Sequence, residues 1–217
     1  MTYYTDLKTF QRAHRDNFSE SLALRTHRGL SWLNRAEQSE DDPDAKFIFL
    51  WIAFNAIYAQ DFDAIKSTES NNFSRFLDKL LNIDSEHLIS NLVWQEFPNS
   101  IRVLLDNEFV FNPFWDYHNG NITEQEYKDK FNTAKSLASK ALGNMQTNVV
   151  LRLVLSRLYT LRNQLIHGGA TWNSSVNRNQ LRDANNFLHK LIPALLTIMM
   201  ENPSELWGDA NYPVIKV

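Results

Sequence analysis

The sequence predicts an all-α protein, and three observations lead to that fold class. The chain has 217 residues but only 6 Gly and 6 Pro, so it lacks the turn residues that strand-rich folds need. Long stretches place apolar residues three and four positions apart, which is the spacing of one helix face. The chain has no Cys, and 43% of its residues are hydrophobic, so a core can form without disulfides or a structural metal.

The first part of the chain is expected to hold a surface helical segment followed by a buried helix. Residues 5–38 read as one long helix or two abutting helices, with Gly29 as a candidate bend. Asp42 and Pro43 predict the next helix start, because Asp caps helices and Pro suits the first turn. Residues 45–59 are apolar around most of a helix circumference, which indicates a central, buried helix.

Shorter elements are expected in the middle of the chain. Residues 60–72 are polar and indicate a surface loop. Helices are expected at about 73–82, 85–96 and 100–107. The aromatic stretch 109–117 either stacks nucleic-acid bases or forms a small satellite core under a loop.

Two clear helix patterns follow, and a third closes the predicted bundle. Thr123 with Glu126 is a capping-box pattern, and its helix should end near Gly143. Residues 147–167 give the clearest amphipathic spacing, and two glycines should end that helix. A last helix is expected over 175–200.

The remaining predictions concern the end of the chain and its division into domains. Pro193 should kink the last helix or end its first half. The length predicts one domain, or one domain with an insertion. The single domain over 1–217 is expected to comprise an N-terminal helical extension (1–44), a core bundle (45–200) and a C-terminal tail (201–217).

Charge is distributed unevenly along the chain. Residues 1–148 carry 15 basic and 21 acidic side chains, whereas residues 149–217 carry 7 basic and 4 acidic ones. Any site for a polyanion should therefore lie in the last third. No stretch is long and apolar enough to span a bilayer, and the first thirty residues are polar, so we expect a soluble cytoplasmic protein without membrane association.

The candidate chemistry lies at the end of the predicted helix over 147–167. Arg162, Asn163 and His167 stand there, directly before Gly168. In RNA cleavage the 2′-hydroxyl loses a proton, the 5′-oxygen gains one, and the phosphorane needs positive charge. Histidine and arginine supply these functions without a metal. His167 stands five positions after Arg162, which is about 140° around the helix axis, so they do not share one strict face.

This motif resembles that of the HEPN superfamily, in which an arginine and a polar residue precede a histidine near the end of a bundle helix. The aromatic helix with Trp51, Ala53, Phe54, Asn55 and Tyr58 also resembles the Apea-like branch of that superfamily. The resemblance covers roughly residues 45–200, and only the short motif is specific.

The resemblance implies a HEPN-like antiparallel helical bundle with additional peripheral helices, which forms a homodimer with two motif helices facing one another. Many active members are metal-independent endoribonucleases that act as toxins or in phage defence. By analogy, Arg162 would orient or stabilise the phosphate and His167 would be the general acid or base. Asn163 would hold the geometry or contact RNA. The RNA substrate and an antitoxin-like protein are the expected partners, and no cofactor or metal is expected.

Three further cations are candidate RNA contacts: Arg157, Arg178 and Arg182. Arg178 and Arg182 lie one turn apart on the last helix, and the preceding loop should place them near His167. Solvated helix charges are the commoner explanation for each one.

Two other functions remain open. The protein is alternatively a non-catalytic HEPN-type module that dimerises or binds a partner, such as a nucleotide or an antitoxin-like protein. A third possibility is an unrelated helical bundle whose apolar faces pack against another protein. Scattered histidines without metal-like spacing, and the lack of a phosphate-binding glycine loop, argue against metal, ATP or nicotinamide chemistry.

Overall fold

The computed structural model describes residues 2–58, 70–205 and 207–208. The regular elements in these ranges are all helical and none is a strand, so the predicted all-α fold class is confirmed. The chain divides into two compact units, which we call unit 1 (residues 1–89 and 184–217) and unit 2 (residues 90–183). The single domain predicted for 1–217 stays a prediction.

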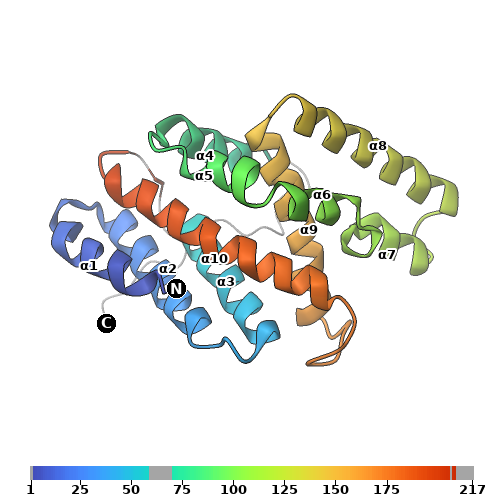
Figure 1. Cartoon of the computed structure of the whole chain (residues 1–217), viewed down its shortest axis with the longest axis horizontal. Helices are drawn as coiled ribbons and strands as arrows, with labels where there is room; N and C mark the ends of the chain where they lie inside the picture. The colour runs from blue at the N-terminus through green and yellow to red at the C-terminus, as the bar shows by residue number, and fades with distance from the viewer. Residues whose placement is uncertain (1, 59–69, 206, 209–217) are drawn as a thin grey trace. The chain divides into compact units, whose positions relative to one another are not determined.

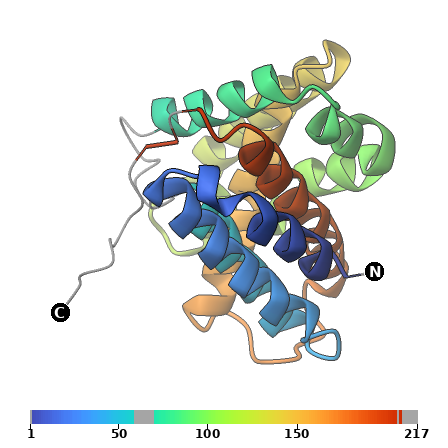
Figure 2. The same ribbon diagram turned by 90° about the vertical axis from the view of Figure 1, so that its left-hand side faces the viewer.

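Unit 1 is built from both ends of the chain. Its elements are α1 (Tyr4–His14), the 3₁₀ turn η1 (Arg15–Asn17), α2 (Glu20–Glu37), α3 (Pro43–Tyr58), α4 (Ser70–Ile83) and the part of α10 (Arg178–Glu201) from Ala184 onward (Figure 1). α2 and α3 lie side by side as the most extensive helix pair (Figure 2). The segment over 5–38 is thus two helices, and the break falls before Ser19, whose hydroxyl accepts the Leu22 N–H at 3.2 Å.

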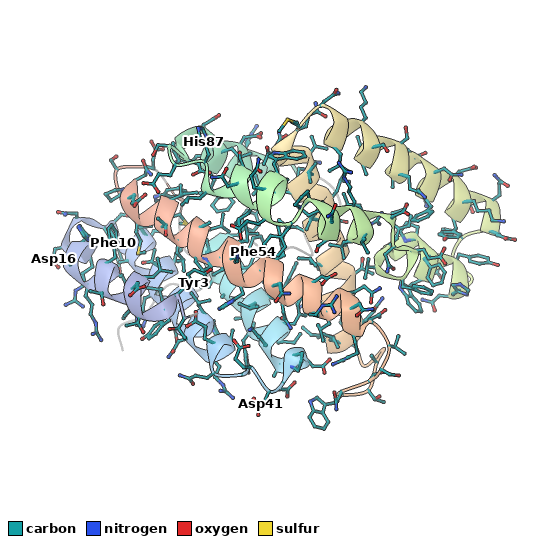
Figure 3. All side chains as sticks on the ribbon, viewed as in Figure 1. Tyr3, Phe10, Asp16, Asp41, Phe54 and His87 are labelled. Carbon is teal, nitrogen blue, oxygen red and sulfur yellow. The ribbon has the colours of Figure 1, made fainter. Side chains whose placement is uncertain are left out.

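α3 is the central helix that the sequence predicts. It begins at Pro43, and the Asp42 carboxylate caps it by accepting the Ala45 N–H at 3.0 Å. Buried residues occupy most of its circumference because neighbouring helices cover several of its sides. Figure 3 labels Phe54 in this buried set and Asp41 on the surface before the helix. The fully buried apolar side chains of α3 include Phe47, Leu50, Trp51, Ala53, Phe54 and Ile57.

One carboxylate joins three helices of unit 1. Glu37, at the end of α2, accepts the backbone N–H groups of Tyr3 at 2.6 Å and Tyr4 at 3.3 Å. These groups open α1, where the positive end of the helix dipole favours an anion. The same carboxylate lies 3.2 Å from Nε2 of His189 on α10. Burial, followed by the charge of Lys46, lowers the pKa of His189, and the Glu37 hydrogen bond opposes that shift.

Unit 2 is a second helical assembly. It contains α5 (Leu88–Asn91) from Ser90, the π-helical turn η3 (Leu92–Glu96), α6 (Pro98–Asp106), the 3₁₀ turn η4 (Glu108–Val110), α7 (Asn112–His118), α8 (Glu124–Gly143), α9 (Thr147–Ile166) and the first residues of α10. The helix expected over 85–96 is in fact α5 followed by η3. α5 starts late because Asp84 accepts the N–H groups of Leu88 and Ile89, both at 2.9 Å.

The local start signals of unit 2 are confirmed. Thr123 and Glu126 form the full capping box, with the Thr123 N–H donating to the Glu126 carboxylate at 2.7 Å. α9 covers almost the predicted range. α7 was expected only as an aromatic stretch before a turn, because seven residues are too few to show a helical period.

Other predictions change at particular residues. The loop expected over 60–72 lies largely outside the described residues, and its last three residues instead belong to α4. α10 continues through Pro193, so the proline does not end the helix. The tail from 201 is described only in part. Trp207 is buried there, and its indole N–H donates to the Asn202 carbonyl at 3.2 Å, whereas Tyr212 and Pro213 lie outside the described residues.

No helix in the described ranges is both long enough and apolar enough to span a membrane.

Gly29 permits a close approach of three helices in unit 1. A Cβ at this position would lie 2.9 Å from Cγ1 of Ile57 on α3 and 3.3 Å from Cδ2 of Leu196 on α10. Both neighbours are fully buried. α2 therefore packs on α3 and α10 through a position where any side chain is too large.

We expect Gly29→Ala to lower the free energy of unfolding by about 1–3 kcal/mol, because overpacking outweighs the better helix propensity of alanine. Urea denaturation measures this change. Gly143→Ala at the end of α8 is the matched control, since a Cβ there meets no atom within 4 Å and stability should be unchanged or higher. Equal or greater stability of Gly29→Ala would contradict the close packing.

Candidate functional site

The predicted motif lies at the C-terminal end of α9, within unit 2. Arg162 and Asn163 stand in its last turns, and His167 is the residue directly after the helix. Nη1 of Arg162 donates to Oδ1 of Asn163 at 2.9 Å, and its Cζ lies 5.9 Å from the Tyr159 ring centroid. Arg162 and Asn163 are half-buried, whereas His167 is exposed. The motif therefore presents a held guanidinium and an accessible imidazole.

The two glycines end α9 in different ways. Gly168 adopts a φ of 72°, and its N–H donates to the Leu165 carbonyl at 3.4 Å. The Gly169 N–H donates to the Gln164 carbonyl at 2.7 Å, which completes a Schellman arrangement. A Cβ on Gly169 would lie 3.1 Å from that carbonyl oxygen. Gly168 thus supplies the left-handed conformation and Gly169 the close approach, and the predicted helix end is confirmed.

Gln164 fixes this helix end to two other segments of unit 2. Its Nε2 donates to the Phe109 carbonyl at 2.6 Å, and its Oε1 accepts from Nδ2 of Asn177 at 2.8 Å. Sequence reasoning missed Gln164. In the sequence, Gln164 is only one more amide residue after Asn163. Its partners Phe109 and Asn177 lie 55 and 13 positions away, so no local pattern indicates the two bonds.

The Gln164 bridge brings the start of α10 beside the end of α9. Asn177 immediately precedes Arg178, the first residue of α10. Arg178 is therefore gathered with the Arg162–Asn163 pair and His167 at one end of unit 2. Figure 2 shows α9 leading into the loop that returns to α10.

Arg182 stands one helical turn beyond Arg178. Its side chain is 65% exposed, and its Nε lies 3.1 Å from Oδ1 of Asp183. An exposed ion pair of this kind is worth little, so Asp183 holds the guanidinium only weakly. Arg182 is therefore accessible, and its role as an RNA contact stays a prediction.

Arg157 is not part of this surface, and its predicted RNA contact is corrected. The residue is only 5% exposed. Its Nη2 donates to the Leu105 carbonyl at 3.2 Å, and its Cζ lies 4.2 Å over the Phe111 ring. Burial lowers the pKa of Arg157 to about 10. Arg157 therefore joins α9 to the end of α6 and to Phe111 beyond it, and it is closed to RNA.

The aromatic stretch packs on itself and on α8, as expected of a satellite core, whereas Phe109 and Trp115 stay exposed, so the stacking role stays a prediction. Phe114 of α7 packs edge-on against Tyr127 of α8 with ring centroids 5.7 Å apart. The Tyr127 hydroxyl donates to Glu108 at 2.6 Å, and burial followed by this bond raises the pKa of Tyr127 to about 12. The Trp115 indole N–H donates to the Phe109 carbonyl at 2.8 Å. The cluster thus fixes the carbonyl that receives Gln164.

Carboxylates are missing from the sequence around the motif. No Asp or Glu occurs between Asp129 and Asp183. The same stretch contains Lys130, Lys135, Lys140, Arg152, Arg157, Arg162, Arg178 and Arg182. This stretch of sequence covers α9, the following loop and the first turn of α10, so these elements contribute cations and no carboxylate, although the whole chain carries −3.

A separate hollow of about 550 Å³ lies between α6 and α8. The Lys135 ammonium and the Asp106 carboxylate pair at 2.6 Å on its wall. Its lining includes none of the motif residues. Among the residues that the structure describes, no three His, Asp or Glu side chains group closely enough to share a metal ion.

Comparison with known proteins gives no relative. The chain matches no family model, and no curated protein or solved structure matches it. The HEPN resemblance therefore rests on the residues alone. Trp51, Phe54 and Tyr58 of the aromatic helix are buried in unit 1, where the Oδ1 of Asn55 is buried without a hydrogen-bond partner. The Arg162 to His167 motif belongs to unit 2.

We expect Arg157→Ala to lower the free energy of unfolding by about 2–4 kcal/mol, because it leaves a cavity and an unpaired Leu105 carbonyl. Arg182→Ala is the control, and urea denaturation measures the free energy of unfolding of both variants. The exposed Arg182 side chain should change stability by less than about 0.5 kcal/mol. If Arg157→Ala kept full stability, the guanidinium would not be the structural contact described above.

Proposed function

We propose that the protein is a metal-independent endoribonuclease of HEPN type, acting as a toxin or defence nuclease through an active site shared by two subunits. One observation carries the proposal. An exposed imidazole, His167, and a held guanidinium, Arg162, stand at one rigid helix end within a stretch that has no carboxylate. The site thus combines a proton-transfer group with positive charge.

These residues suit cleavage by attack of the RNA 2′-oxygen on the adjacent phosphorus. His167 of one subunit takes the proton of the 2′-hydroxyl as the new P–O bond forms. The bond between phosphorus and the 5′-oxygen breaks, and the second His167 gives that oxygen a proton. The products are a 2′,3′-cyclic phosphate and a free 5′-hydroxyl. Arg162 stabilises the negative charge of the phosphorane, and Asn163 orients Arg162 through its 2.9 Å hydrogen bond.

Two subunits explain the placement of the motif residues better than one. In an ideal helix, positions 162 and 167 lie about 140° apart around the axis, although His167 follows the end of α9 and arginine is long. Among the described residues no hydrogen bond joins their side chains, and Arg162 instead contacts Asn163 and Tyr159. A two-fold axis beside the end of α9 would let the arginine of one copy face the histidine of the other.

The exposed apolar side chains beside the motif favour a second candidate function. Ile166 is 47% exposed directly before His167. A non-catalytic module that dimerises or binds an antitoxin-like partner through this end of α9 would use such a surface. That module would form dimers and would not cleave RNA, so the experiments below separate the two functions.

We expect the protein to cleave RNA in the presence of EDTA, and His167→Ala to reduce the rate about 100-fold or more, since it removes the proton-transfer group. Gel analysis of labelled RNA measures the rate and identifies the cyclic phosphate end. His27→Ala, which replaces an exposed histidine of α2, should cleave like the parent protein. Undiminished cleavage by His167→Ala at unchanged thermal stability would overturn the proposal.

We expect mixed dimers of Arg162→Ala and His167→Ala subunits to regain part of the activity that each variant lacks alone. One intact arginine and one intact histidine then meet in the shared cleft. The two proteins are unfolded, refolded together and assayed for cleavage. The control mixes His167→Ala with a subunit that carries both substitutions, and it should stay inactive. Equal inactivity of the two mixtures would show that the site is not shared in this way.

A further inference from the structure

A closed loop projects from the site between α9 and α10. The Gln164 to Asn177 hydrogen bond of 2.8 Å joins the last turn of α9 to the residue before α10, so residues 167–176 form a compact loop of the Ω type. Its base holds His167 and Arg178. Such loops are frequently functional when a rigid scaffold positions them.

The tip of this loop presents a tryptophan to solvent. Trp172 is 74% exposed, the highest value among the large apolar side chains of the described residues that are exposed. It occupies the second position of a β-turn, which the Ser174 N–H closes onto the Thr171 carbonyl at 3.1 Å. Asn173, the third residue, has a φ of 54°, as type II turns require at that position. The turn therefore places Trp172 at the tip of the loop, where most of its side chain meets solvent.

Trp172 is not the only exposed apolar side chain in this part of the described chain. Ile166, the last residue of α9, and Val176, which is 61% exposed, lie before and after it in the sequence. Single apolar side chains on a surface are ordinary, but three within eleven residues mark a contact site. The question is which molecule covers them.

The arginines at the base of the loop favour a polyanion as the partner. Arg178 stands at the loop base, and no carboxylate lies between Asp129 and Asp183 in the sequence. A nucleic-acid strand offers phosphates to the arginines and flat bases to the indole, and stacking on an aromatic ring needs no particular base.

We propose that Trp172 is a stacking platform for an unpaired base of the RNA strand, close to the bond that is cleaved. The inference rests on the proposed function, which supplies the RNA. Five residues of chain separate Trp172 from His167, so their Cα atoms lie at most about 18 Å apart. A base in a duplex is already stacked on both sides, so the substrate is single-stranded at this position.

Binding to a short single-stranded RNA tests the platform without cleavage. All proteins carry His167→Ala, and anisotropy of a dye-labelled oligomer gives Kd. Adding Trp172→Ala should weaken binding about 5- to 150-fold, the range for loss of one stacked base. Trp172→Phe should restore most of the affinity. Val103→Ala, which shortens a 62% exposed apolar residue of α6 outside the loop, is the matched control and should bind like its parent.

The salt dependence separates stacking from charge. Trp172→Ala should leave the slope of log Kd against log salt concentration unchanged. Arg178→Ala should reduce that slope by about the amount that one phosphate contact contributes. When the same oligomer is annealed to its complement, the Trp172→Ala protein and its parent should bind the duplex with the same Kd.

Four outcomes overturn the inference, and they are distinguishable. If Trp172→Ala binds as tightly as its parent while the protein with His167 cleaves RNA, the stacking platform is wrong and the nuclease stands. If neither binding nor cleavage occurs, both proposals fail. If Trp172→Ala instead lowers the dimer fraction measured by light scattering, the indole covers a second copy. Equal loss of duplex binding would show that the indole does not select an unpaired base.

Discussion

The geometry of the candidate site depends on one amide side chain. Gln164 donates to the Phe109 carbonyl and accepts from Asn177, so a single residue joins the end of α9 to a turn and to the start of α10. Each hydrogen bond contributes only about 0.5–1.5 kcal/mol to stability. Their larger effect is positional, because they determine how His167 and Arg178 stand relative to each other. Groups that act on one substrate need such fixed placement more than they need strong binding.

The charge of the sequence around the candidate site differs from the charge of the whole chain. The whole chain carries −3, yet the stretch between Asp129 and Asp183 contains cations and no carboxylate. At physiological salt, exposed charges act over about 8 Å, so a phosphate at the end of α9 responds to the nearest arginines and little to the acidic remainder. The acidic composition of the whole chain is therefore compatible with the RNA site proposed at this helix end.

Local sequence signals predicted much of the fold, and long-range contacts account for what was missed. Capping by Asp42 and by Thr123 needs only residues within three positions, and both were found. Gln164 could not be found, since its partners are distant in sequence. Arg157 is a different case. It stands three residues after Val154 and four before Leu161, so the helical period already placed it on the buried face, and its charge concealed this.

The interleaved order of the two units bears on how the chain folds as it is made. Unit 1 closes only through contacts between early and late residues: Asn185 donates to the Pro43 carbonyl at 2.9 Å, and His189 meets Glu37 at 3.2 Å. A ribosome releases the chain from its N-terminus, so residues 90–183 are complete before these late residues emerge. α2 and α3 must wait for α10 with part of their apolar surface uncovered. The inserted unit is thus the first that can be finished during synthesis, and the surrounding one is the more exposed to aggregation and to chaperones.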